Sequence, residues 1–208
     1  MTKYAKVSAG LVAAWFVFAI AASALQVFNT GGPPLAVGLA ALMPIILFAI
    51  WFATSPGFRK FLMSLDARVV TLVHSWRVLG FAFVAFAAYK ILPNMFALPA
   101  GWGDIAIGVT APFVALKLAR SEHRGSFIAW QFLGILDLVV AITLGTLSGI
   151  INPHGISTAA MAVLPLSVVP TFGVPMLLIL HFISIAQARQ WSPQEAVGVG
   201  RQLYSSAA

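Results

Sequence analysis

Six apolar segments, each close to 20 residues long, constrain this chain more than any other feature of its sequence. An α-helix needs about 20 predominantly apolar residues to cross the hydrocarbon core of a bilayer. The segments cover residues 7–28, 34–53, 69–92, 102–118, 127–147 and 165–187. The sequence therefore predicts an all-α, polytopic membrane protein, in which a bundle of six transmembrane helices forms a single transmembrane domain over residues 1–208.

Charged residues are too scarce to cover a water-facing surface. Only 8% of the residues are charged and 61% are hydrophobic, whereas soluble domains carry about 25% charged residues. The net charge is +7 at pH 7, but the basic residues are scattered at helix ends, where they suit anionic lipid headgroups. We therefore expect a lipid bilayer and no nucleic acid as partner. The chain has no Cys, which excludes disulfides, thiol catalysis and Cys-ligated clusters.

Basic residues alternate between the predicted loops. They occur at the N-terminus, after the second and fourth segments and in the C-terminal tail: Lys3, Lys6, Arg59, Lys60, Arg68, Arg120, Arg124, Arg189 and Arg201. The other loops contain no Lys or Arg, apart from Lys90 at the end of the third segment. Because cytoplasmic loops carry the excess of Lys and Arg, we predict that both termini are cytoplasmic, in a multi-pass protein of the bacterial inner membrane.

Five polar side chains lie inside the predicted spans, in their cytoplasmic half: His74, Arg77, Gln131, Asp137 and His181. A charge at the centre of a spanning helix costs about 2.5–3.5 kcal/mol and is a functional candidate by default. With a rise of about 1.5 Å per residue, Arg77 lies roughly 12 Å and His181 roughly 9 Å from the cytoplasmic ends of their segments. We predict that these five residues converge and bind a substrate or relay protons.

A second polar group is predicted near the outer face, formed by Lys90, Asn94, Trp102 and Asp104. Trp102 is typical of an interface anchor. Small residues accompany both Asp104 and Asp137 at helical spacing, so that each carboxylate should face another helix. A purely structural interpretation remains open, in which Arg77 pairs with Asp137 and Lys90 pairs with Asp104.

The sixth segment contains three prolines and a glycine: Pro165, Pro170, Gly173 and Pro175. Proline removes a backbone donor and kinks a helix. One interpretation is a merely kinked helix. The other is a broken helix that forms a binding site or a hinge, as in many transporters.

His74 and His181 allow a further hypothesis. Two histidines on different helices at similar depth could be the axial ligands of a b-type haem, although no spacing motif supports this ligation. No other metal site is predicted, and both residues could equally carry protons.

The chain's size, helix count and predicted cytoplasmic termini resemble the substrate-binding subunits of energy-coupling-factor vitamin transporters. This resemblance is architectural and covers no motif, so function does not transfer with it. The Gly103-Asp104 pair in a span also resembles the Gly-Asp of membrane lysoplasmalogenases, but nothing around it matches.

Three functions follow as hypotheses. The first is a small-solute carrier, or the membrane-embedded substrate-binding subunit of one, with a small-molecule ligand. The second is a haem- or other cofactor-binding component of an electron-transfer chain or enzyme. The third is a non-catalytic subunit or scaffold, in a homo-oligomer or a membrane complex.

Overall fold

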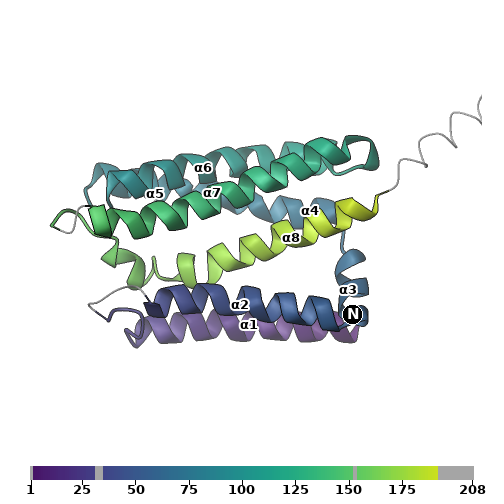
Figure 1. Cartoon of the computed structure of the whole chain (residues 1–208), viewed down its shortest axis with the longest axis horizontal. Coiled ribbons are helices and arrows are strands. Elements are labelled where there is room, and N and C mark those ends of the chain that lie inside the picture. Colours follow the sequence, from purple (N-terminus) through teal and green to yellow (C-terminus); the bar gives the residue numbers. More distant parts are fainter. Residues whose placement is uncertain (1, 31–34, 152–153, 192–208) are drawn as a thin grey trace, which may run out of the picture.

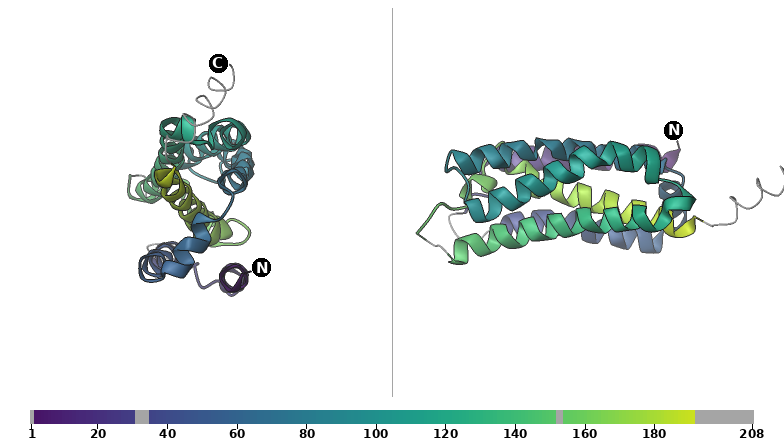
Figure 2. Two further views of the ribbon diagram at one scale, coloured as in Figure 1. Left: turned by 90° about the vertical axis from the view of Figure 1, so that its right-hand side faces the viewer. Right: turned by 90° about the horizontal axis from the view of Figure 1, so that it is seen from above.

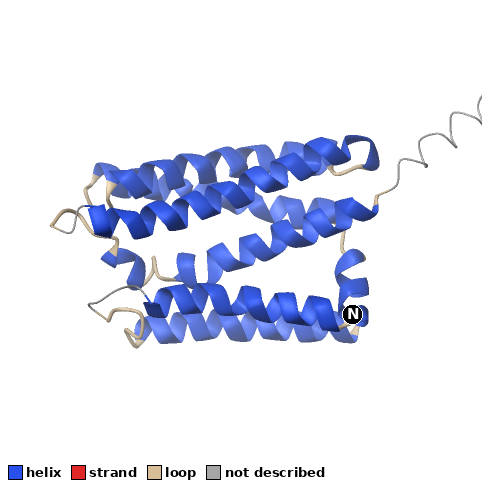
Figure 3. Cartoon of the chain, in the orientation of Figure 1, coloured by secondary structure: helices blue, strands red, loops and turns tan. Residues whose placement is uncertain are grey.

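Helices form most of the described chain in the computed structural model, which describes residues 2–30, 35–151 and 154–191 (Figures 1 and 3). The elements are α1 (Lys3–Ala24), α2 (Leu35–Thr54), α3 (Pro56–Met63), α4 (Ala67–Leu72), η1 (Val73–Gly80), α5 (Phe81–Ala88), α6 (Asn94–Phe113), η2 (Val114–Leu118), η3 (Ser121–His123), α7 (Arg124–Ile151), η4 (Ala159–Ala162), η5 (Val169–Gly173) and α8 (Val174–Gln190). No strand occurs among these described residues.

Six helical stretches are long and apolar enough to cross a membrane, which confirms the predicted all-α architecture with spans for a membrane protein. They are Lys3–Ala24, Leu35–Thr54, Ala67–Ala88, Asn94–Leu118, Ser121–Ser148 and Val169–Gln190. The third stretch runs through α4, η1 and α5 without a break. Residue 34, the predicted start of the second span, lies outside the described residues.

The helices form two layers with α8 running obliquely between them (Figures 1 and 2). One layer contains α4, η1, α5, α6 and α7, and the other contains α1 and α2. The third and fourth spans make the most extensive contact, because α6 packs along η1 and α5. The other face of α6 packs on α7, and α8 contacts α7 and α4 on one side and α2 on the other.

Nine basic side chains gather at one end of the bundle, which we call the basic end. α1 begins there, α2 and η2 end there, and α8 ends there too (Figure 1). The residues are Lys3, Lys6, Arg59, Lys60, Arg68, Lys117, Arg120, Arg124 and Arg189. Lys90 is the basic residue at the opposite end within the described ranges. Arg201 lies outside the described residues.

The predicted start of the fourth span at residue 102 is wrong, because α6 begins eight residues earlier, at Asn94. The two prolines at 93 and 99 indicated a loop. Pro93 instead occupies the N-cap, and Pro99 lies inside the helix. Burial of Phe96, Ala97 and Ala100 on the same face compensates for the hydrogen bond that Pro99 cannot donate.

The sixth span begins later than the predicted residue 165. Pro165 lies in a turn, Pro170 lies in the π-helical turn η5, and Pro175 stands in the first turn of α8. Because Pro175 has no N–H, the carbonyl of Thr171, four residues earlier, lacks its α-helical donor. The indole Nε1 of Trp15 on α1 donates to this carbonyl at 3.0 Å, so α1 satisfies a backbone group that the proline leaves free.

Candidate functional site

The side chain of Arg77 lies in the middle of the bundle. Arg77 belongs to the 3-10 segment η1, ten residues after the start of its span at Ala67, and its side chain is 1% exposed. A 3-10 stretch within a helix often marks a functional hinge. The backbone of α6 comes very close here, because a Cβ on Gly108 would overlap the backbone at Arg77 and Val78.

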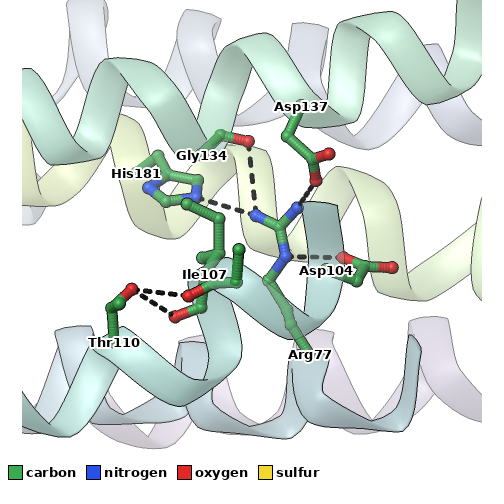
Figure 4. Close-up of polar contacts among 8 residues, drawn as sticks. Arg77, Asp104, Ile107, Thr110, Gly134, Asp137 and His181 are labelled. Atoms are coloured by element: carbon green, nitrogen blue, oxygen red, sulfur yellow. Dashed lines mark hydrogen bonds and ion pairs between the residues drawn. The ribbon is translucent and has the colours of Figure 1, made fainter. Parts of the chain in front are cut away.

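Arg77 is held by groups from three other elements (Figure 4). Its Nε donates to Asp104 Oδ1 on α6 at 2.6 Å, and its Nη2 donates to Asp137 Oδ2 on α7. Its Nη1 donates to the carbonyl of Gly134 at 3.2 Å and lies 3.4 Å from Nε2 of His181 on α8. We call Arg77, Asp104, Asp137 and His181 the Arg77 cluster.

The Arg77 cluster contains more acid than base. One guanidinium faces two carboxylates, whose side chains are 18% (Asp104) and 16% (Asp137) exposed. Within the described residues, each of these carboxylates has Arg77 as its ion-pair partner. If both were ionised, the cluster would carry one net negative charge at mid-span, where charge is poorly solvated.

The contacts of His181 fix its tautomer. Its Nδ1 lies 2.5 Å from Oε1 of Gln131, which can only accept, so Nδ1 carries a proton. Its Nε2 faces an N–H of Arg77 and therefore accepts. The neutral ring satisfies both contacts, whereas a protonated ring would direct an N–H at the guanidinium.

His74 stacks on His181, with ring centroids 3.9 Å apart and an angle of 21° between the planes. The ring centroid of Trp130 lies 5.9 Å from the ring centroid of each of these histidines. Axial histidines bind haem from its two faces, each directing a nitrogen at the iron. Rings in face-to-face contact leave no space for a porphyrin, and both nitrogens of His181 are engaged by protein groups. The geometry therefore does not fit bis-histidine haem ligation by this pair.

The structure brings together all five residues of the predicted inner group: His74, Arg77, Gln131, Asp137 and His181. It separates the predicted outer group. Lys90 and Asn94 line a surface pocket at the opposite end of the bundle, and Trp102 is 58% exposed. Asp104 joins the Arg77 cluster instead.

Of the two ion pairs in the structural interpretation, Arg77–Asp137 is present. The Lys90–Asp104 pair is wrong, because Asp104 pairs with Arg77. The cause is the misplaced start of α6. With a helix that begins at Asn94, Asp104 lies ten residues inside the span and not near its outer end. At that depth Asp104 meets Arg77, which lies equally far inside its own span.

Two features of the site were missed in the sequence: the Gly134 carbonyl and the ring of Trp130. A Cβ on Gly134 would overlap the ring of His181, and one on Gly103 would overlap the Asp137 carboxylate. The small residues near the two aspartates therefore make room for side chains of the cluster itself. Gly134 stands three residues before Asp137, and this helical spacing was the available signal.

Comparison with known proteins gives a family and no function. None of the curated proteins and none of the solved structures matches this chain. The family model described as a domain of unknown function, DUF8737, matches residues 34–189. This range extends from the start of α2 almost to the end of α8 and contains the whole Arg77 cluster. The chain belongs to the family defined by this domain of unknown function, DUF8737.

Proposed function

We propose that this protein is a proton-linked carrier of a small solute in a cell membrane, and that Asp104 and Asp137 share the transported proton. The observation that supports this proposal is the excess of one carboxylate over guanidinium groups in the middle of the spans. Ionisable groups at that depth are typical of ion pathways and proton relays in transporters.

A proton on one carboxylate makes the Arg77 cluster electrically neutral. The protonated side chain can still accept a hydrogen bond from Arg77, while the ionised one forms the ion pair. When the proton leaves, two carboxylates compete for one guanidinium, and the balance of contacts between η1, α6 and α7 changes. Proton binding would in this way alter the packing of three spans at once.

α8 is the element that we propose to move. It carries His181, which contacts Arg77, and it follows the π-helical turn η5 with its two nearby prolines. Irregular turns of this kind are common at hinges and functional sites. All three guanidinium nitrogens of Arg77 contact protein groups, so we propose that the solute binds elsewhere or only after these contacts open.

The basic end is proposed to face the cytoplasm. Nine Lys and Arg residues of the described chain lie there, against Lys90 at the other end. Cytoplasmic loops carry such an excess. In this orientation both ends of the described chain are cytoplasmic, and a bacterial inner membrane is the proposed location.

The proposal predicts solute uptake that depends on a proton gradient and on Asp137. Proteoliposomes with a pH gradient would be tested with labelled amino acids, carboxylic acids, sugars and polyamines. We expect uptake of one of these classes, collapse of the uptake by a protonophore, and loss of the uptake in Asp137→Asn. Glu122→Gln is the control, because Glu122 is exposed at the basic end. Gradient-driven uptake that is equal in Asp137→Asn and the wild type, or no uptake of any class, would contradict the proposal.

One observation favours a second candidate, the subunit or homo-oligomer. No residue of α2 is buried, and α1 buries only Ala19, Ala22 and Ser23. These two spans expose faces that partner helices could cover. The molecular mass in detergent, measured by light scattering, would exceed that of one chain plus its micelle if this candidate is correct.

A further inference from the structure

Several buried polar side chains lie outside the hydrogen bonds of the Arg77 cluster. Both ring nitrogens of His74, Nε2 of Gln131, Oγ of Ser184 and Oε1 of Gln187 have no partner among the described protein groups. The four residues are 0–4% exposed. A buried polar group without a partner costs about 1–3 kcal/mol, and in proteins such groups are usually satisfied by internal water.

These side chains follow one another from the Arg77 cluster to the basic end. His181, Ser184 and Gln187 stand three residues apart on one face of α8, which is a rise of about 4.5 Å per step. On the third span, His74 lies one turn from Arg77 toward the basic end. Gln131 lies one turn from Gly134 in the same direction on α7. One water molecule can bridge groups at such a spacing.

The last member of this series opens onto a pocket at the basic end. Gln187 lines the pocket together with Asp66, Arg68, Arg120 and Gln190. Its Nε2 donates to the carbonyls of Leu62 and Leu65 at 2.8 and 2.9 Å, which leaves Oε1 as the unpaired atom.

An apolar group lies on the opposite side of the Arg77 cluster, where the buried hydroxyls of Ser167 and Thr171 are already hydrogen-bonded to protein atoms. Between the cluster and the other end lies a buried group formed by Phe83, Ala87, Leu92, Phe96, Ala97 and Ala100. None of these side chains can hydrogen-bond a water molecule. The polar series and the apolar group therefore distinguish the two ends of the bundle.

We infer that a file of water molecules runs along α8 from the basic-end pocket to His181 and gives protons access to the Arg77 cluster from that end. This inference rests on the proposed proton site and assigns its side of access. Protons would pass from the pocket by Gln187 and Ser184 to the layer of His74 and Gln131. Both of these side chains contact His181, which contacts Arg77. The apolar group blocks the other end in this conformation.

The absence of Cys from the chain allows a direct test by single cysteine substitutions. Ser184→Cys is nearly isosteric and lies six residues before the end of α8 at Gln190. Ala100→Cys is the matched control, since Ala100 is equally buried and lies six residues after the start of α6 at Asn94. Ser64→Cys, exposed at the basic end, reports which side of each vesicle faces outward.

A charged, membrane-impermeant methanethiosulfonate would be added to each side of the vesicles in turn. We expect Ser184→Cys to react at least about tenfold faster than Ala100→Cys, and only from the side that modifies Ser64→Cys. The reason is that a hydrated thiolate attacks the reagent, forms a mixed disulfide with it and releases methanesulfinate. Thr71→Cys, one turn from His74 on the buried face of α4, should behave like Ser184→Cys and serves as the second variant if that protein does not fold. Full reaction in denaturant shows that each thiol is present.

Equal protection of Ser184→Cys and Thr71→Cys from both sides, or reaction from the opposite side, would overturn the inference. This outcome is independent of transport. The file of water molecules could be present even if the protein carries no solute. Conversely, uptake could depend on Asp137 even if no water reaches Ser184.

Discussion

Arg77→Gln is expected to lower the free energy of unfolding by about 3–5 kcal/mol. The substitution leaves Asp104 and Asp137 without a cation in a site where each of them is less than one-fifth exposed. It also removes the donors to the Gly134 carbonyl and to His181. Titration of the purified protein with dodecyl sulfate in mixed micelles, followed by circular dichroism, would measure the loss.

The matched control is Arg120→Gln, because Arg120 is exposed at the basic end. It should change the stability by less than about 0.5 kcal/mol, as other surface substitutions do. Adding Asp104→Asn and Asp137→Asn to Arg77→Gln should restore much of the loss, since the triple variant has no unpaired charge. If Arg77→Gln were as stable as Arg120→Gln, the ion pairs would not hold the spans together.

Gly108→Ala is expected to destabilise the protein by about 1–3 kcal/mol, the cost of overpacking a close contact. The new Cβ would meet backbone atoms of Arg77 and Val78, which cannot rotate away as a side chain could. Separation of η1 from α6 would also lengthen the contact between Arg77 and Asp104. The same unfolding titration measures this effect.

Gly38→Ala provides the contrast, because nothing lies within 4 Å of the position of a Cβ at Gly38 on α2. Inside a helix, Ala is favoured over Gly by roughly 0.5–1 kcal/mol. Gly38 is the fourth residue of α2, so this variant should be as stable as the wild type or more stable. Equal stability of Gly108→Ala and Gly38→Ala would show that the close approach of α6 to η1 is not required.

The six helices that are long and apolar enough to cross a membrane were predictable, because length and apolarity alone decide whether a segment can do so. Their ends were less predictable where proline occurs. Pro99 indicated a loop by its local chemistry, but burial of its neighbours on α6 depends on other helices and cannot be seen in the local sequence. The local preference of proline for a loop was outweighed by the tertiary packing of α6.

The composition of the Arg77 cluster was predicted in part. The depth of a residue in the membrane can be estimated by counting residues from the end of its helix. This count placed Arg77 and Asp137 at similar depths, close together. The same count failed for Asp104, because it began at residue 102 and not at the true start of α6, Asn94. The stacking of His74 on His181 depends on the lateral positions of two helices and on the rotamers of both side chains. Neither can be obtained by counting residues along the sequence.

Infrared spectroscopy of the purified protein tests the central claim, that the excess carboxylate of the Arg77 cluster holds a proton at neutral pH. The account predicts the C=O band of a protonated carboxylic acid in the wild type at pH 7. The band should disappear in Asp137→Asn and in Asp104→Asn, because the remaining carboxylate then pairs with Arg77 and ionises, and it should persist in Glu122→Gln. Two results would contradict the account. One is a wild-type spectrum that shows both carboxylates ionised, whether or not the sample contains Na⁺. The other is a band that survives both aspartate substitutions.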